Sequence, residues 1–138
     1  MARAVPYMLG AMVAVAGLAI AGGLAQAAGE SRPTALRRLE MGQWELRPRP
    51  ANAPVRRLCI NDAWQLMQIE PAQASCRRFV VADAPDEVAA TFNCAQAGSA
   101  RTDLRVENAR LVQIRSQGVA RGAPFELSLE GRRVGACP

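Results

Sequence analysis

The sequence predicts a mainly β domain, built as an antiparallel curved sheet or partly closed barrel of about seven short strands, with one short helix and two disulfides. Three observations carry this prediction. Apolar and polar residues alternate along several short segments, which is typical of strands with one buried face. Turn-forming residues separate these segments at short intervals. Four cysteines follow an apolar N-terminal segment: Cys59, Cys76, Cys94 and Cys137.

The N-terminal segment has the order of a secretory leader. Arg3 supplies a positive charge, residues 5–24 are almost free of polar side chains, and Ala25-Gln26-Ala27 offers the small residues that a signal peptidase accepts. We expect residues 1–27 to be a signal peptide cleaved after Ala27. The protein would then be periplasmic or secreted in a bacterium of the Gram-negative type, without a stable membrane anchor. An uncleaved anchor is the alternative, because the apolar stretch is near the ~20 residues that a membrane span needs.

Cleavage leaves 111 of the 138 residues, which is the size of one domain. Residues 28–40 are expected to form a flexible lead-in, with a short helical turn starting at Thr34, and residues 41–138 a single β-rich, disulfide-stapled domain. All 17 basic residues are arginines, against 12 acids. This mild positive excess predicts at most weak association with anionic surfaces. Export and the scarcity of aromatic residues argue against nucleic-acid binding.

The first two expected strands flank a proline-rich loop. Residues 42–47 place Trp44 and Leu46 on one face, residues 48–54 contain three prolines, and residues 55–60 form the second strand. A short helix is expected next, capped by Asn61 or Asp62 and with apolar residues at helical spacing: Ala63, Trp64 and Met67.

The strongest strand signal lies between the two central cysteines. Residues 76–82 are rich in β-formers, Asp83-Ala84-Pro85-Asp86 has the chemistry of a turn, and residues 87–94 alternate, with Val88, Ala90 and Phe92 on one face. This pattern predicts a hairpin. A turn centred near Pro85 places Cys76 opposite Cys94.

Three more strands are expected in the C-terminal part. They cover residues 100–107, 110–116 and 125–130, and a glycine-containing connection, residues 118–123, separates the last two. Each segment is apolar on one side, which predicts one sheet with one buried face.

The cysteines are expected to form structural disulfides. Their intervals of 17, 18 and 43 residues and the absence of His do not match a zinc site or a redox-active Cys-x-x-Cys pair. We favour the pairs Cys76–Cys94, across the hairpin, and Cys59–Cys137, from an early strand to the C-terminus. The pairing of Cys59 with Cys76 and of Cys94 with Cys137 stays open, because periodicity does not exclude it.

These residues resemble a family of small secreted bacterial proteins, grouped as domain of unknown function 3617. The resemblance covers roughly residues 40–138. It rests on Gly42-x-Trp44-Glu45, on Cys59 followed by a short helix, on the two central cysteines and on the closing Gly135-Ala136-Cys137-Pro138. It implies a periplasmic, β-rich, disulfide-containing domain and brings no catalytic residues with it.

We expect a non-enzymatic envelope module that binds a partner protein or a small ligand, without a cofactor or a metal. No His is present to activate a nucleophile, and no catalytic residues can be named. Core packing is the expected role of the large apolar residues, and the alternative is a small pocket between helix and sheet, lined by Trp44, Trp64, Met67 and Phe92. A hydrolase or sugar-active enzyme that relies on carboxylates alone is the competing function. The neighbouring acids Asp83, Asp86 and Glu87 lie in the expected turn, where solvation is their expected role.

Overall fold

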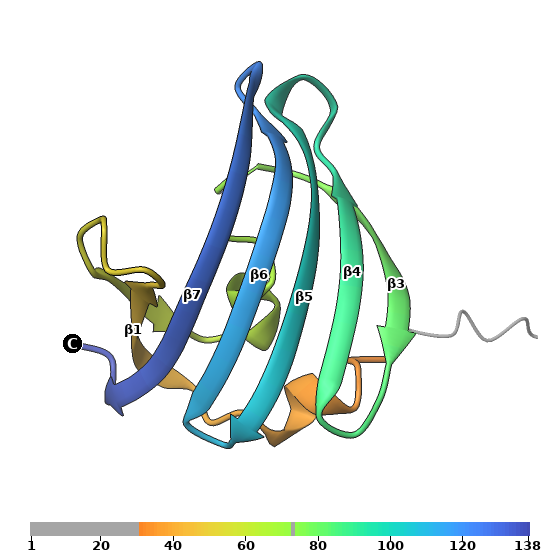
Figure 1. The fold of residues 1–138 in the computed structure, drawn as a ribbon. Helices are drawn as coiled ribbons and strands as arrows, with labels where there is room; N and C mark the ends of the chain where they lie inside the picture. The colour runs from red at the N-terminus through yellow and green to blue at the C-terminus, as the bar shows by residue number, and fades with distance from the viewer. Residues whose placement is uncertain (1–30, 73) are drawn as a thin grey trace, which may run out of the picture.

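The computed structural model describes residues 31–72 and 74–138, and within them the chain forms one antiparallel sheet (Figure 1). The seven strands lie in the order β2-β1-β7-β6-β5-β4-β3. The expected leader, residues 1–27, lies outside the described residues. The strand bounds are β1 Gly42–Pro48, β2 Arg56–Ile60, β3 Arg77–Asp83, β4 Glu87–Asn93, β5 Gly98–Asn108, β6 Leu111–Ala120 and β7 Ala123–Gly135.

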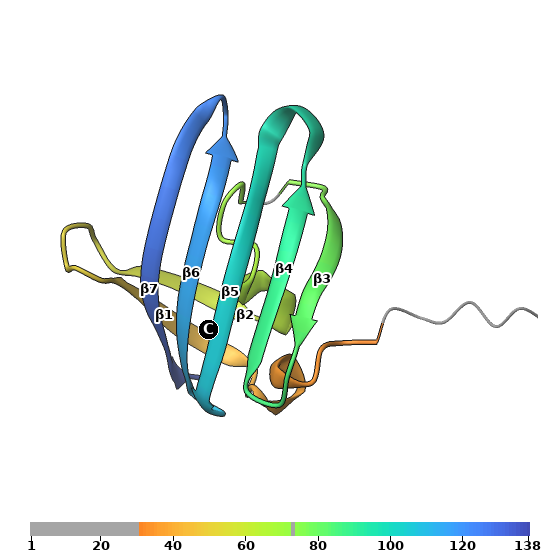
Figure 2. The same cartoon turned by 45° about the vertical axis from the view of Figure 1, so that its right-hand side comes forward.

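The predicted fold class is confirmed, and the sheet is open rather than closed into a barrel. It curls strongly, so that β1 and β2 pass behind the long central strands (Figures 1 and 2). Strands β5, β6 and β7, of 11, 10 and 13 residues, are longer than the sequence predicts. The expected connection at 118–123 is largely strand, because Gly118 pairs with both Ala100 and Phe125.

Within the described residues, three single turns of 3-10 helix accompany the sheet: η1 Ala35–Arg38, η2 Ala63–Leu66 and η3 Ala95–Ala97. Turn η1 is the helical turn expected from Thr34, and η3 was not expected. Turn η2 is the predicted helix. The Asp62 side chain accepts a hydrogen bond from the Trp64 N–H, and the Gln65 side chain accepts one from the Asp62 N–H. This reciprocal cap fixes the direction in which Trp64 enters the core.

Residues 35–39 correct the expectation of a flexible lead-in over residues 28–40. Ala35 and Leu36 are fully buried, Leu39 is nearly so, and η1 contacts β4, β5 and η2. The apolar side of this one turn covers the concave face of the sheet, so the packed unit begins near residue 35 rather than at 41. Residues 28–30 lie outside the described part of the chain.

The core lies between the concave face of the sheet and the turns η1 and η2. The inward residues of the predicted alternation, including Val88, Ala90 and Phe92, are buried as expected. One polar pair lies among them: Thr102 and Ser116 are buried, and their hydroxyl oxygens are hydrogen-bonded at 2.9 Å. The convex face carries most of the charged residues, because side chains alternate between the two faces of a strand.

Candidate binding surface on the outer face of the sheet

Both favoured disulfides are confirmed. Cys76 and Cys94 extend the register of the β3–β4 hairpin by one position beyond the Arg77–Asn93 pair, and their Cα atoms lie 4.1 Å apart. Cys59 and Cys137 have Cα atoms 5.4 Å apart and join edge strand β2 to the segment after β7, across strand β1. All four cysteines are therefore structural, and none of them is a free thiol.

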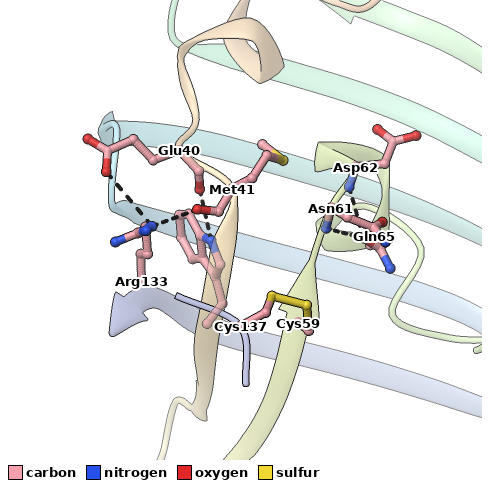
Figure 3. Close-up of a disulfide and its surroundings, with 9 residues drawn as sticks. Glu40, Met41, Cys59, Asn61, Asp62, Gln65, Arg133 and Cys137 are labelled. Carbon is pink, nitrogen blue, oxygen red and sulfur yellow. Dashed lines mark hydrogen bonds and ion pairs between the residues drawn. A yellow bond between two sulfur atoms is a disulfide. The ribbon is translucent and has the colours of Figure 1, made fainter. Parts of the chain in front are cut away.

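The motifs at the two ends of the domain meet at the corner of the sheet around Cys59–Cys137 (Figure 3). Gly42 has φ of +141°, and a Cβ atom there would collide with the Gly135 carbonyl and the Arg133 guanidinium. The Trp44 indole N–H donates to the Glu40 carbonyl at 3.1 Å, and Arg133 donates to the Met41 carbonyl at 2.8 Å. Packing and hydrogen bonding explain why these residue types occur here.

The candidate pocket residues are all buried in the core: Trp44, Trp64, Met67 and Phe92. The Trp64 and Phe92 rings meet edge to face, with centroids 6.3 Å apart. The Arg78 guanidinium lies over the Trp64 ring, 4.3 Å from its centroid. This packing fits the core role of the four residues, and the depression described below lies on the opposite face of the sheet.

The outer face carries a network of ion pairs on strands β1, β2 and β7. Glu45 is almost buried and accepts hydrogen bonds from Arg47 at 2.7 Å and Arg57 at 2.8 Å. Hydrogen bonds from Arg47 and then Arg57 hold the pKa of Glu45 below its usual value. A hydrogen bond from Arg49 is the main cause that lowers the pKa of Glu130. Both carboxylates are tied into the surface and are poorly placed to donate a proton.

A depression of about 600 Å³ crosses the outer face from β3 toward the start of the proline-rich loop. We call it the outer trench. Its bottom follows one cross-strand row of the sheet, which has small side chains at both ends and two charged residues at its centre: Ala82, Ala89, Asp103, Arg115 and Ser128. Longer side chains stand along its sides, in the rows above and below: Arg49, Glu87, Arg101, Arg105, Glu107 and Gln113.

Most charged side chains of the outer trench form ion pairs with neighbouring residues. Asp103 accepts two hydrogen bonds from Arg101, Arg105 pairs with Glu107 at 2.8 Å, and Arg49 pairs with Glu130 at 2.7 Å. Within the described chain, two charged groups of the trench have no ion pair, the Arg115 guanidinium and the Glu87 carboxylate. These two residues lie two strands apart across the sheet and two residues apart along the strands. Ideal sheet spacings then place their Cα atoms about 12 Å apart.

The acids that the sequence groups in the turn do not converge on one point. The Asp83 carboxylate accepts the Thr34 N–H at 2.8 Å, and the backbone carbonyl of Asp86 accepts the Val106 N–H. Only Glu87 reaches the outer trench. No cluster of three or more metal-binding side chains occurs in residues 31–72 and 74–138.

The outer trench was not predicted from the sequence. Alternation places Ala89, Arg115 and Ser128 on the polar side of their strands, but only the register of four neighbouring strands aligns them in one row. None of the helical turns in the described ranges is long and apolar enough to cross a membrane. No protein-family model, curated protein or solved structure matches this chain.

Proposed function

We propose that this protein is an exported, non-enzymatic binding module of the cell envelope, and that the outer trench binds a small zwitterionic ligand of the short-peptide class. The two disulfides support an oxidising compartment, because such bonds persist mainly in exported proteins. Export follows from the leader expected at residues 1–27. The binding surface differs from the pocket considered from the sequence, because those four side chains are packed in the core.

The single observation that carries the ligand class is the arrangement of Arg115 and Glu87 in the outer trench. Each lacks an ion-pair partner within residues 31–72 and 74–138, whereas the charges between and around them are paired. A ligand with one anionic and one cationic end complements this arrangement. An arginine fork binds a carboxylate through two parallel hydrogen bonds, and a carboxylate accepts hydrogen bonds from an ammonium group.

The chemistry of the trench supports binding rather than catalysis. The acids Asp103 and Glu107 are held by arginines two residues before them on the same strand, and all four cysteines are in disulfides. The chain has no His. A general acid or nucleophile needs a group whose pKa or partner activates it, and the trench places arginines beside its acids instead.

Triglycine in three forms tests the proposal: the free zwitterion, the C-terminal amide and the N-acetylated peptide. Binding is measured by isothermal titration to protein purified from the periplasm. The free peptide is expected to bind, and each blocked form to bind at least about tenfold more weakly, because each has lost one charge-assisted contact. In Arg115→Ala the amide and the free peptide should bind alike, and in Glu87→Gln the acetylated and free peptides should bind alike.

The matched control is Arg121→Ala, because Arg121 lies at the tip of the β6–β7 hairpin with a side chain 82% exposed and outside the outer trench. This variant should discriminate between the three peptides as the native protein does. Equal affinity of the native protein for all three forms, or no binding of any form, would overturn the zwitterion assignment. Native mass spectrometry of the same preparation tests export, because a retained leader would show in the mass.

A further inference from the structure

Strand β3 is an edge strand that exposes an apolar segment. It pairs with β4 on one side, and no other strand of the described residues pairs with its second side (Figures 1 and 2). Its three central residues are exposed: Phe79 by 57%, Val80 by 40% and Val81 by 52%. They are half of the six large exposed apolar residues in the described chain. Such an edge is a template for pairing with a further strand.

The opposite edge of the sheet is protected. Strand β2 has five residues, and Cys59 within it is joined to Cys137. Its two arginines are engaged, Arg56 with Glu70 at 3.2 Å and Arg57 with Glu45 at 2.8 Å. Short length and charged residues are the usual means of preventing edge pairing. The two edges therefore differ, and β3 is the one suited to a partner.

We propose that β3 pairs antiparallel with β3 of a second copy of this chain, around a two-fold axis at Val80. This register places Phe79 of each copy opposite Val81 of the other. It also places Arg77 of each copy at the end where Asp83 of the other lies, so the sequence Arg-Arg-Phe-Val-Val-Ala-Asp is complementary in charge to itself. A self-complementary patch is what a two-fold homodimer requires.

Two local features limit how much of the strand can pair. The ladder to β4 shifts at a bulge between Val80 and Ala82, and bulges commonly end pairing. At the far end, Thr34 donates its N–H to Asp83, whose carboxylate can accept further hydrogen bonds. The pairing is therefore short and centred on Phe79, Val80 and Val81. An interface of this size gives a dimer that dissociates on dilution.

Sedimentation velocity on the full exported protein, over a wide dilution series, tests the proposal. Dimer is expected at high concentration and monomer on dilution. Val80→Lys should abolish the dimer, because two lysines would meet at the axis. Val119→Lys is the control, since Val119 is 42% exposed but lies on β6, with strands paired on both sides. It should dimerise as the native chain does.

A charge exchange tests the register. Asp83→Arg should raise the dissociation constant of the dimer at least about tenfold, because it sets like charges together. The double variant Arg77→Asp with Asp83→Arg should restore dimerisation. Circular dichroism identifies any variant that fails to fold, and the charge exchange is read from the folded variants. A native protein that stays monomeric at every concentration, or a dimer unaffected by Val80→Lys, would overturn the proposal.

Discussion

The hydroxyl groups of Thr102 and Ser116 form a hydrogen bond inside the core, at 2.9 Å, on neighbouring strands β5 and β6. They are two of the three polar or charged residues that are buried in the described chain. On folding, each hydroxyl loses its hydrogen bond to water and gains one to the other hydroxyl. The pair is therefore buried at little cost in free energy.

Removal of one member of this pair should cost more than removal of both. Thr102→Val leaves the Ser116 hydroxyl without its protein partner, and we expect a loss of about 1–3 kcal/mol in the free energy of unfolding. The double variant Thr102→Val with Ser116→Ala should lose less than the sum of the two single variants. Urea unfolding of all four proteins measures the coupling. Strict additivity would contradict the pairing.

The two disulfides should contribute unequally. The Cys59–Cys137 bridge spans 78 residues and the Cys76–Cys94 bridge spans 18. From the entropy of the closed loops, we expect the loss of the first to cost roughly 4.5 kcal/mol and the loss of the second roughly 3 kcal/mol. Urea unfolding of the paired Cys→Ser variants measures both losses.

Yield gives a simpler check of the longer bridge. Cys137→Ser should lower the periplasmic yield much more than Arg121→Ser, whose side chain is on the surface. Thiol titration of the denatured native protein should find no free cysteine. Four free thiols would refute both bridges.

Glycine at position 118 should be required for full stability, because the backbone of Ser99 on the neighbouring strand leaves no room for a side chain. A Cβ atom on Gly118 would collide with the Ser99 carbonyl oxygen and lie 2.8 Å from the Ala100 Cα, and backbone atoms in the middle of a sheet cannot move aside. Gly118→Ala should lower the free energy of unfolding by about 1–3 kcal/mol. Gly135→Ala is the control, because a Cβ there meets no atom within 4 Å, and its effect should stay within about 0.5 kcal/mol. Thermal unfolding measures both variants. If Gly118→Ala and Gly135→Ala lose the same free energy of unfolding, the predicted collision at position 118 is wrong.

Acid should destabilise the protein partly through Glu45. Arg47 and Arg57 lower the pKa of this carboxyl in the folded state, so it contributes stability above the pKa of the unfolded chain, about 4.3. That contribution is lost as the pH falls through the lower folded pKa. Between about pH 7 and about pH 3, Glu45→Gln should therefore lose less stability in urea unfolding than the native protein does.

The control for the acid prediction is Glu126→Gln. Glu126 is exposed and has no ion pair in the part of the chain that the structure describes. This variant should lose as much stability on acidification as the native protein. If Glu45→Gln also follows the native curve, the two arginines do not stabilise the carboxylate.

The sequence was sufficient for the features that depend on local patterning. Alternation of apolar residues such as Val88, Ala90 and Phe92 determines which face of a strand is buried, because side chains alternate with a period of two. The turn chemistry around Pro85 predicts the hairpin, and the structure adds a bulge between Val80 and Ala82 that shifts the register by one residue and brings Cys76 opposite Cys94.

The tertiary structure decided what depends on the relative positions of distant segments. The helical turn at 35–38 joins the core because the curled sheet leaves a concave face for Ala35 and Leu36 to cover. The row that contains Arg115 in the outer trench, and the exposure of β3 at one edge, both follow from the order of the strands. Local sequence patterns specify the faces of strands, whereas only the assembled sheet specifies which strands are neighbours.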